Sequence, residues 1–307
     1  MSVRVSVQAV PSDRASWLEL AREVEAAGFH RLYAADHPGA SPAPFVALAA
    51  VAAVTERVGL GTCVANAGRW EPIDLANAVA TLDVVSDGRA MLGVGAGHTP
   101  DEWTSTGRAF PSPGERVARM AEVVEATQAL LEGEPISYRG RHVTLVDAVL
   151  REPRPVQGRI ALLVGGNGER VLRFAARHAD VVSVTGLGRT LGDGHRYDVD
   201  WSPPATERTL DLVRSTAAAA GRAPEVEALV QVVDITDDAG AAADRIAPLV
   251  PGASAKDLLS TPFAWIGTID EITAKLRRLH DHGITSYVIR SPALAAARRI
   301  MTALGID

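Results

Sequence analysis

The sequence predicts a single (β/α)8 barrel. Eight short apolar segments typical of strands alternate with segments typical of helices along the 307 residues. Barrels of this class commonly reach this length as one domain, and no linker, low-complexity tract or repeat marks a domain boundary. An open, doubly wound sheet would also alternate, but it usually has fewer strands and a glycine-rich turn after the first one. The turn here reads Pro11-Ser12-Asp13, which favours the barrel.

The predicted strands are short and rich in valine and other apolar residues. The first alternates apolar and polar residues, whereas the fourth is apolar at consecutive positions, as expected of a parallel strand covered on both faces. In chain order the expected strands are residues 3–9, 31–35, 58–65, 90–94, 160–166, 181–185, 227–235 and 287–290.

Start and stop signals place the helices between these strands. Ser12 and Asp13 can cap the first helix, Gly28 ends it, and Thr268 with Glu271 forms a capping box for a later one. The other helices are expected at residues 44–55, 72–86, 113–132, 168–179, 206–220, 238–260 (as two short helices), 268–282 and 292–304. Two insertions are expected: a small hairpin at about residues 135–146, and a long loop at about residues 186–204 that is typical of a lid or binding loop.

Composition and charge exclude several classes of protein. A net charge of -6 and a pI of 5.8 provide no field that attracts nucleic acid or anionic lipid. No apolar run is long enough to span a membrane. Cys63 is the single cysteine, so an internal disulfide is excluded, and no histidine or cysteine cluster has the spacing of a metal site. We therefore expect a soluble, cytoplasmic protein without a metal, a nucleic-acid partner or a membrane anchor.

The barrel prediction turns this map into a list of candidate site residues, because barrel enzymes place their sites at the carboxyl ends of the strands. Polar or glycine residues that follow the expected strands are Asp36, His37, Asn66, His98, Glu102, Gly165, Gly166, Asn167, Gly168, Thr185 and Arg290. Few of these would be chosen for packing alone.

His37 is a candidate for proton transfer, because an imidazole titrates near neutral pH. It follows a carboxylate, Asp36, and precedes a proline that keeps its backbone extended. The alternative is a histidine that only hydrogen-bonds a loop carbonyl, with Asp36 as a helix cap or a structural hydrogen-bond acceptor. Gly165 to Gly168 precede a helix, where bare backbone amides favour a phosphate; the alternative is a turn that needs only positive φ angles.

Four segments together resemble the bacterial luciferase-like oxidoreductases, and most closely their coenzyme F420-dependent branch. They are ERVGLGTCVANAGRWEP, LDVVSDGRAMLGVGAGHTPDEW, ERVARMAEVVEATQALLEGEPISYRGRHVTL and LLVGGNGERVLRFAARHAD. The resemblance covers most of residues 1–185. It implies a (β/α)8 barrel, a homodimer, and a deazaflavin ring at the carboxyl ends of the strands.

Residue by residue, the resemblance implies the following site. Asp36 and His37 match a pair near the ring, with His37 the proton donor or acceptor. Cys63, Val64 and Asn66 match a segment that supports the ring, often through a cis peptide bond that precedes no proline. Gly165, Gly166 and Asn167 match the phosphate loop. His98 stands where some relatives carry an acidic residue, and Asp101 and Glu102 are near enough to take over that role.

The implied reaction is hydride transfer between coenzyme F420 and a small organic substrate, with His37 handling the accompanying proton. One alternative is an FMN-dependent monooxygenase of the same family, supplied with reduced flavin by a partner reductase. Another is a catalytically silent flavin-binding or scaffold barrel. Trp70, Trp103 and Trp201 are candidates for stacking on a substrate, or equally for packing in the core.

Overall fold

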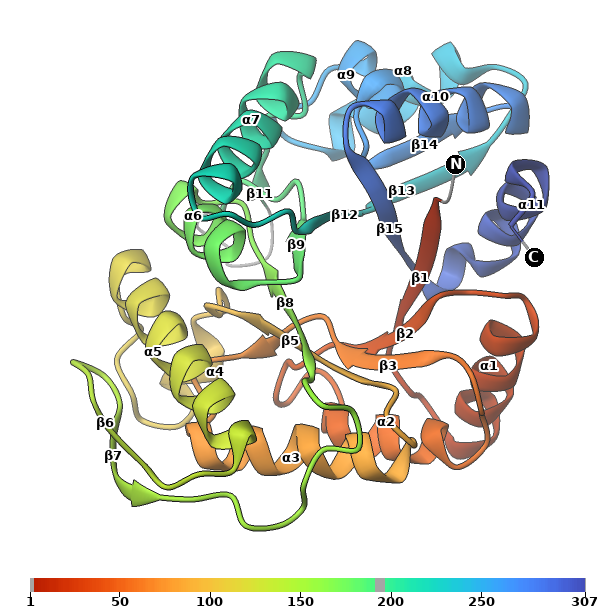
Figure 1. Ribbon diagram of the computed structural model, residues 1–307. Helices are drawn as coiled ribbons and strands as arrows, with labels where there is room; N and C mark the ends of the chain where they lie inside the picture. The colour runs from red at the N-terminus through yellow and green to blue at the C-terminus, as the bar shows by residue number, and fades with distance from the viewer. Residues whose placement is uncertain (1–2, 191–196, 307) are drawn as a thin grey trace. The chain divides into compact units, whose positions relative to one another are not determined.

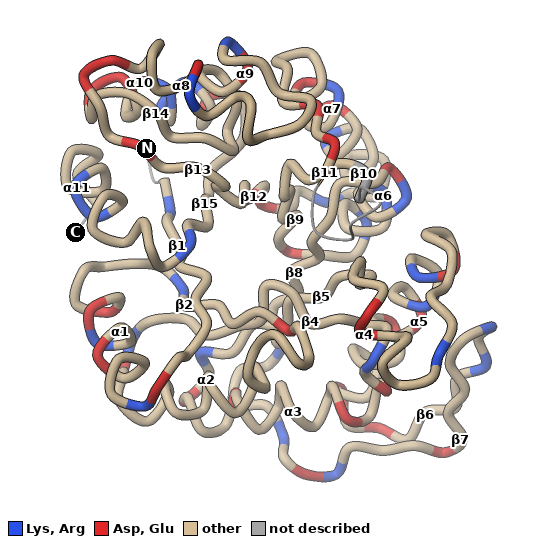
Figure 2. The backbone as a smooth tube through the Cα atoms, turned by 180° about the vertical axis from the view of Figure 1, so that it is seen from behind, with Lys and Arg blue, Asp and Glu red and all other residues tan. Residues whose placement is uncertain are grey.

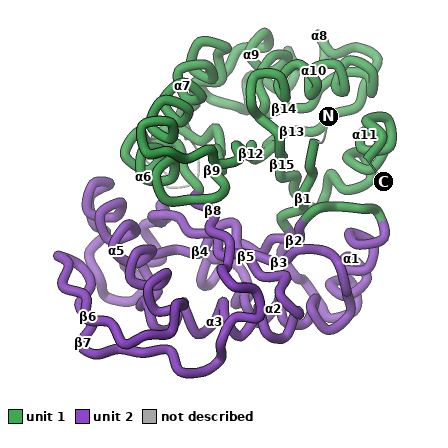
Figure 3. The backbone as a smooth tube through the Cα atoms, in the orientation of Figure 1, with its two compact units in different colours: residues 1–8, 27–30, 165–307 green, residues 9–26, 31–164 purple. Residues whose placement is uncertain are grey.

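The computed structural model describes residues 3–190 and 197–306. Its chain forms two compact units (Figure 3). Unit 1 comprises residues 1–8, 27–30 and 165–307, and unit 2 comprises residues 9–26 and 31–164. All eight predicted strands are present in the described residues, and they alternate with helices along the chain as a (β/α)8 barrel requires (Figure 1).

Unit 2 is built on parallel strands in the order β2-β3-β5-β8, with the short β4 beside the end of β5. Every residue of β5 is buried, as expected of a strand covered on both faces. The elements are α1 (Arg14–Ala26), β2 (Arg31–Ala34), α2 (Pro44–Ala52), β3 (Gly59–Thr62), β4 (Ala65–Asn66), α3 (Pro72–Val85), β5 (Ala90–Gly95), α4 (Asp101–Thr104), α5 (Pro113–Glu132) and β8 (Ala161–Gly165). The predicted hairpin is formed by β6 (Ile136–Arg139) and β7 (Thr144–Ala148).

Unit 1 is built on parallel strands in the order β1-β15-β12-β9, and a second parallel pair joins β13 to β14. Its strands are β1 (Arg4–Ala9), β9 (Val181–Val184), β10 (Arg189–Thr190), β11 (Tyr197–Asp198), β12 (Glu225–Leu229), β13 (Val232–Ile235), β14 (Ala264–Gly267) and β15 (Ile284–Arg290). Its helices are α6 (Glu169–His178), α7 (Pro203–Ala219), α8 (Ala239–Ile246), η1 (Ala247–Leu249), α9 (Ala255–Ser260), α10 (Ile269–Asp281), η2 (Ser291–Ala293) and α11 (Leu294–Leu304).

Three local features differ from the sequence prediction. Residues 227–235 form two strands rather than one, because the amide of Val230 still bonds to β15 whereas the amide of Gln231 bonds to Phe263, beside β14. β14 itself was missed, since four buried residues show no periodicity that separates a strand from other buried segments. The helix α4 forms in what was predicted as an irregular loop.

The long loop predicted at residues 186–204 contains the antiparallel pair β10–β11, and α7 begins within its predicted range. Residues 191–196 of this loop lie outside the described residues. Its role as a lid stays a prediction.

Charged residues of both signs are interspersed along the helices and loops of both units (Figure 2). Among the described residues, no helix combines the length and the apolar character that crossing a bilayer requires.

Candidate functional site

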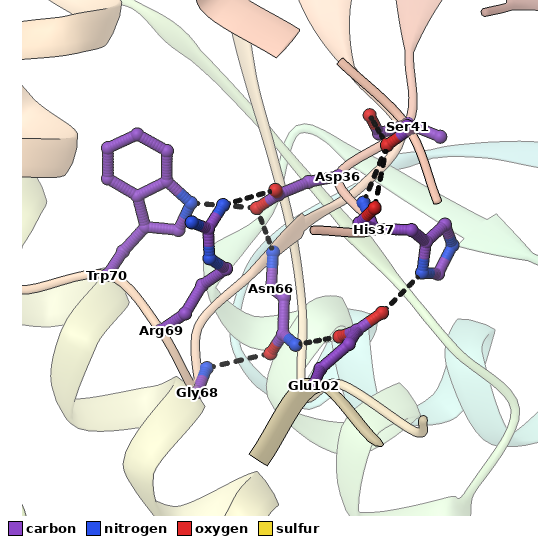
Figure 4. Close-up of polar contacts among 9 residues, drawn as sticks. Asp36, His37, Ser41, Asn66, Gly68, Arg69, Trp70 and Glu102 are labelled. Carbon is purple, nitrogen blue, oxygen red and sulfur yellow. Dashed lines mark hydrogen bonds and ion pairs between the residues drawn. The ribbon is translucent and has the colours of Figure 1, made fainter. Parts of the chain in front are cut away.

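A tight turn after β2 presents the first two site residues, Asp36 and His37. The hydroxyl of Ser41 accepts a hydrogen bond from the His37 amide at 2.8 Å and lies within bonding distance of the carbonyl oxygens of Ala35 and His37. These contacts fix the backbone of the turn, so the directions of both side chains are set locally (Figure 4).

His37 is paired with Glu102, which α4 carries. The distance from His37 Nδ1 to Glu102 Oε1 is 2.6 Å, and Asn66 Nδ2 donates to Glu102 Oε2 at 2.5 Å (Figure 4). The side chain of Glu102 is 5% exposed, whereas that of His37 is 42% exposed. The carboxylate is thus buried and fully engaged, and the imidazole reaches the surface of unit 2.

The orientation of Asn66 is fixed by its own contacts. Its Oδ1 accepts a hydrogen bond from the Gly68 amide at 2.8 Å, so its NH2 group must be the part that faces Glu102. Gly97 packs against the same carboxamide: its φ is +75°, and a Cβ atom added there would overlap Asn66 Oδ1. The glycine is therefore required by both its backbone angle and this close approach.

These contacts determine which nitrogen of His37 is available. Burial is the largest influence on Glu102 and raises its pKa, but the hydrogen bonds from His37 and Asn66 together with the charge of His37 lower it below its usual value overall. An ionised carboxylate can only accept, so Nδ1 of His37 carries the proton in this pair. Nε2 of the neutral ring is then an acceptor, and no described residue hydrogen-bonds to it.

Asp36 has a different environment from Glu102. It is 2% exposed, and its two oxygens accept hydrogen bonds from the Asn66 amide at 3.0 Å, from Arg69 Nη1 at 2.8 Å and from Trp70 Nε1 at 2.8 Å (Figure 4). Asn66 is the last residue of β4, and Arg69 and Trp70 lie on the loop that follows it. Asp36 thus holds that loop rather than pairing with His37, its neighbour in the sequence.

His98 lies beside His37 at the end of β5. The two rings meet edge to face with centroids 5.5 Å apart. Burial, followed by the charge of His37, lowers the pKa of His98 below its usual value. The neutral form of the His98 ring is therefore favoured at neutral pH. The preceding residue, Gly97, is held separately, because its carbonyl accepts a hydrogen bond from Arg116 Nε at 2.8 Å.

The peptide bond between Cys63 and Val64 is cis, as the family resemblance implies. Cys63 is buried, and its amide donates to the carbonyl of Ala34 in the neighbouring strand at 3.0 Å. Two of the three candidate tryptophans, Trp103 and Trp201, are buried, which favours packing over substrate stacking for both.

The residues predicted to bind a phosphate belong to unit 1. Gly168 is exposed and stands at the N-cap of α6 without a side-chain cap. The side chain of Asn167 is occupied, because it accepts from the amides of Thr185 and Gly186 and donates to Thr185 Oγ1 and to the Leu187 carbonyl. A cavity of about 480 Å³ lies next to this loop, lined among others by Asn167, Gly186, Arg208 and Phe263. The Asn167 side chain is therefore not available to an anion, and the Gly166 amide is also engaged, since it donates to the Ser183 carbonyl at 3.1 Å. The donors that suit an anion are the backbone amides at the uncapped start of α6.

The rim list derived from the sequence contains both members of the His37–Glu102 pair, but it does not pair them. The two residues are separated by 65 positions, and Glu102 is brought to His37 by the short helix α4, which no sequence signal predicted. Arg69 was missed altogether. A basic residue next to Trp70 in a loop after a predicted strand is too common a pattern to have indicated a partner for Asp36.

The sequence model of the luciferase-like monooxygenases matches residues 3–260. A protein of Kineococcus radiotolerans named F420-dependent glucose-6-phosphate dehydrogenase is 28% identical, over 91% of this chain and 88% of its own. A protein of Amycolatopsis mediterranei with the same name is 29% identical over 68% of this chain, and the match spans only 63% of that relative.

Among solved structures, the coenzyme F420-dependent tetrahydromethanopterin reductase of Methanopyrus kandleri superposes with a TM-score of 0.77. The match covers 98% of this chain and 97% of the reductase at 22% identity. At that identity the likeness concerns the fold alone, and it confirms the predicted (β/α)8 class.

Proposed function

We infer that this chain, which belongs to the luciferase-like monooxygenase family, is a coenzyme F420-dependent oxidoreductase. The reaction is hydride transfer between the deazaflavin ring and a small organic substrate. The observation that carries the proposal is the 2.6 Å contact between His37 Nδ1 and Glu102 Oε1, which leaves Nε2 of a half-exposed imidazole ready for a proton. The names of the two dehydrogenase relatives support the choice of coenzyme.

The described residues fit such a coenzyme in two respects. Its redox chemistry needs an acid-base group, which the His37–Glu102 pair supplies in unit 2. Its anionic tail needs hydrogen-bond donors, and the uncapped backbone amides at the start of α6 in unit 1 are donors that favour an anion. We propose that the loop of Gly165, Gly166, Asn167 and Gly168 binds the phosphate through the backbone amides at the start of α6. The Gly166 amide, which donates to the Ser183 carbonyl, and the Asn167 side chain shape this loop.

When bound, the deazaflavin supplies or accepts the hydride. The chain's own part is to move the proton that accompanies it. With Glu102 ionised, neutral His37 accepts a proton at Nε2 in one direction, and the imidazolium returns it in the other. Glu102 keeps Nδ1 protonated and stabilises the imidazolium, and Asn66 orients Glu102 through its NH2 group.

The other candidate residues support this pair in different ways. We propose that Asp36 acts by anchoring the loop after β4, and not as the acid or base, because its oxygens already accept three hydrogen bonds. Cys63 and Val64, joined by the cis peptide bond, would support the ring as the family resemblance implies, and His98 would line the site beside His37.

We further propose a homodimer, as the family resemblance implies. The helix α2 supports it, because its sequence PFVALAAVA is apolar throughout, and Val46 is 73% exposed on it. A cytoplasmic location stays a prediction that rests on the single, buried Cys63.

An anaerobic binding titration with coenzyme F420 and, in parallel, with FMN tests the proposed function. We expect saturable binding of F420, followed by hydride transfer with members of a panel of alcohols, aldehydes and sugar phosphates. Tight binding of FMN without F420 binding would instead favour the FMN-dependent monooxygenase. A folded protein that binds neither compound would be the silent barrel.

A further inference from the structure

One arginine of α5 joins three parts of unit 2. Arg119 donates from Nε to the carbonyl of Ala67 at 3.2 Å, and from Nη2 to the carbonyl of Trp70 at 3.1 Å and to Glu71 Oε1 at 2.8 Å. From Nη1 it donates to the carbonyl of His142 at 3.0 Å, in the turn of the β6–β7 hairpin. Its side chain is only 16% exposed.

The turn of the hairpin is itself held by the same face of α5. Glu122, one helical turn beyond Arg119, accepts hydrogen bonds from the amides of Arg141, His142 and Val143 at 3.0, 2.7 and 2.9 Å. Three amide donors on one carboxylate also lower the pKa of Glu122, although burial, the largest single influence, opposes them. The His142 carbonyl is therefore presented to Arg119 in a fixed position.

The loop on the other side of Arg119, residues 66–71, builds the proposed site. Asn66 orients Glu102, and Asn66, Arg69 and Trp70 supply the three donors to Asp36. Arg119 binds this loop at the carbonyls of Ala67 and Trp70, so its guanidinium sets the spacing between the two ends of the segment that carries these donors.

We propose that Arg119 is a positioning residue for the His37–Glu102 pair, and that the hairpin turn, clamped by Glu122, fixes the site loop through Arg119. The inference rests on the proposed function only for its effect on the reaction rate; its effect on the geometry of the His37–Glu102 pair does not depend on that function. The planar guanidinium has five N–H donors in fixed directions and here bonds four acceptors on two segments. A lysine ammonium has three donors on a single atom and would reach fewer of these acceptors. A hairpin outside the strand and helix pattern thereby contributes to the site.

The variants Arg119→Lys and Glu122→Gln test this inference. The matched control is Glu125→Gln, because Glu125 also holds the hairpin, through Tyr138 Oη at 2.8 Å, but at a strand and not at the turn that faces Arg119. Hairpin deletion is unsuitable, since Ile136, Leu145 and Ala148 pack against the apolar cluster of α3 and α5.

The first readout needs no coenzyme. Nitrogen-15 chemical shifts of the His37 ring, at a pH where the imidazole is neutral, report the Nδ1-protonated tautomer that Glu102 imposes. We expect Arg119→Lys and Glu122→Gln to give a mixture of tautomers and Glu125→Gln to keep the wild-type shifts, with thermal unfolding confirming that all three proteins are folded. Unchanged shifts in both test variants, or equal changes in the control, would overturn the inference.

The second readout uses the enzyme with coenzyme F420. We expect kcat to fall about tenfold or more in both test variants, because small displacements of positioned groups cost rate, while KM and coenzyme affinity change less than about twofold. If the wild-type protein does not bind F420, the proposed function is refuted. The nitrogen-15 shifts of His37 would still decide the role of Arg119, because they need no coenzyme. If Arg119→Lys does not fold, Glu122→Gln, which retains Arg119, decides the matter.

Discussion

Replacing Glu102 by glutamine changes one atom of the site and reverses the hydrogen-bond logic of His37. Asn66 can offer Glu102 only its NH2 group, since its oxygen accepts from the Gly68 amide. The glutamine oxygen must therefore turn toward Asn66, and its own NH2 group then faces His37 Nδ1. Nδ1 becomes the acceptor and the proton moves to Nε2, so the nitrogen that should accept the proton already carries one.

The expected loss follows from what the pair contributes. A positioned acid-base group is worth about 10²–10⁴-fold in rate, and a wrong tautomer removes most of that while leaving the shape of the site intact. We expect the rate of hydride transfer in Glu102→Gln to fall within that range, with coenzyme binding nearly unchanged. The wild type should also lose rate as the pH falls through the lowered pKa of Glu102, because protonation ends its role as acceptor, and this acid limb should be absent in the variant.

Single-turnover kinetics with F420 across a pH series measures both effects. Asp101→Asn is the matched control, since Asp101 lies next to Glu102 in α4 but is exposed. Nitrogen-15 shifts of His37 should show the tautomer change directly. A Glu102→Gln enzyme that keeps its rate within about threefold, with an unaltered His37 tautomer, would refute the reasoning.

Two further predictions concern single residues. Gly97→Ala should reduce hydride transfer strongly, because the added Cβ displaces Asn66. Gly107→Ala is the control: its φ is +73° against +75° for Gly97, but the space around it is open, so the substitution should cost stability alone. Kinetics and thermal unfolding of the two variants in parallel separate these outcomes. Lys275 is 4% exposed, with Nζ on the Ala264 carbonyl, and burial, then the charge of a neighbouring arginine, lowers its pKa from 10.5 to about 8. The charged form therefore destabilises the fold by about 3 kcal/mol below pH 8, and this cost is relieved as the pH rises toward 10.5. Lys275→Met should gain about 1–3 kcal/mol at pH 7 and lose that pH dependence in urea unfolding, and equal pH dependence in both proteins would contradict the assignment.

The barrel strands could be predicted because their signals are local. Runs such as residues 90–94 are apolar without a break, and the turns and helix starts between strands carry glycine, proline or capping residues. β14 shows the limit of this approach: its four residues are identified as a strand only by their pairing with β13, a contact that arises from the tertiary fold.

The site was predicted as a set of residues but not as a set of contacts. The family resemblance implied that Asp36 and His37 form a pair near the ring. Successive side chains of an extended chain point to opposite sides, however, and Asp36 turns to the loop after β4 while His37 turns to Glu102. The strand-end rule places residues on a common rim because it follows from topology. The pairing across that rim depends on where a four-residue helix directs one carboxylate, and propensity does not encode this.

Two buried carboxylates of unit 2 thus have separate tasks, and Asn66 connects them. Its backbone amide donates to Asp36 and its side chain donates to Glu102. Asp36 accepts hydrogen bonds from Arg69, Trp70 and Asn66, whereas Glu102 accepts from Asn66 and from Nδ1 of His37, the proposed acid-base group. A displacement of Asn66 would therefore disturb the anchor and the acid-base pair together. Arg119 holds the loop that follows Asn66 from outside the site. We therefore expect its substitution to lower the reaction rate more than it weakens coenzyme or substrate binding.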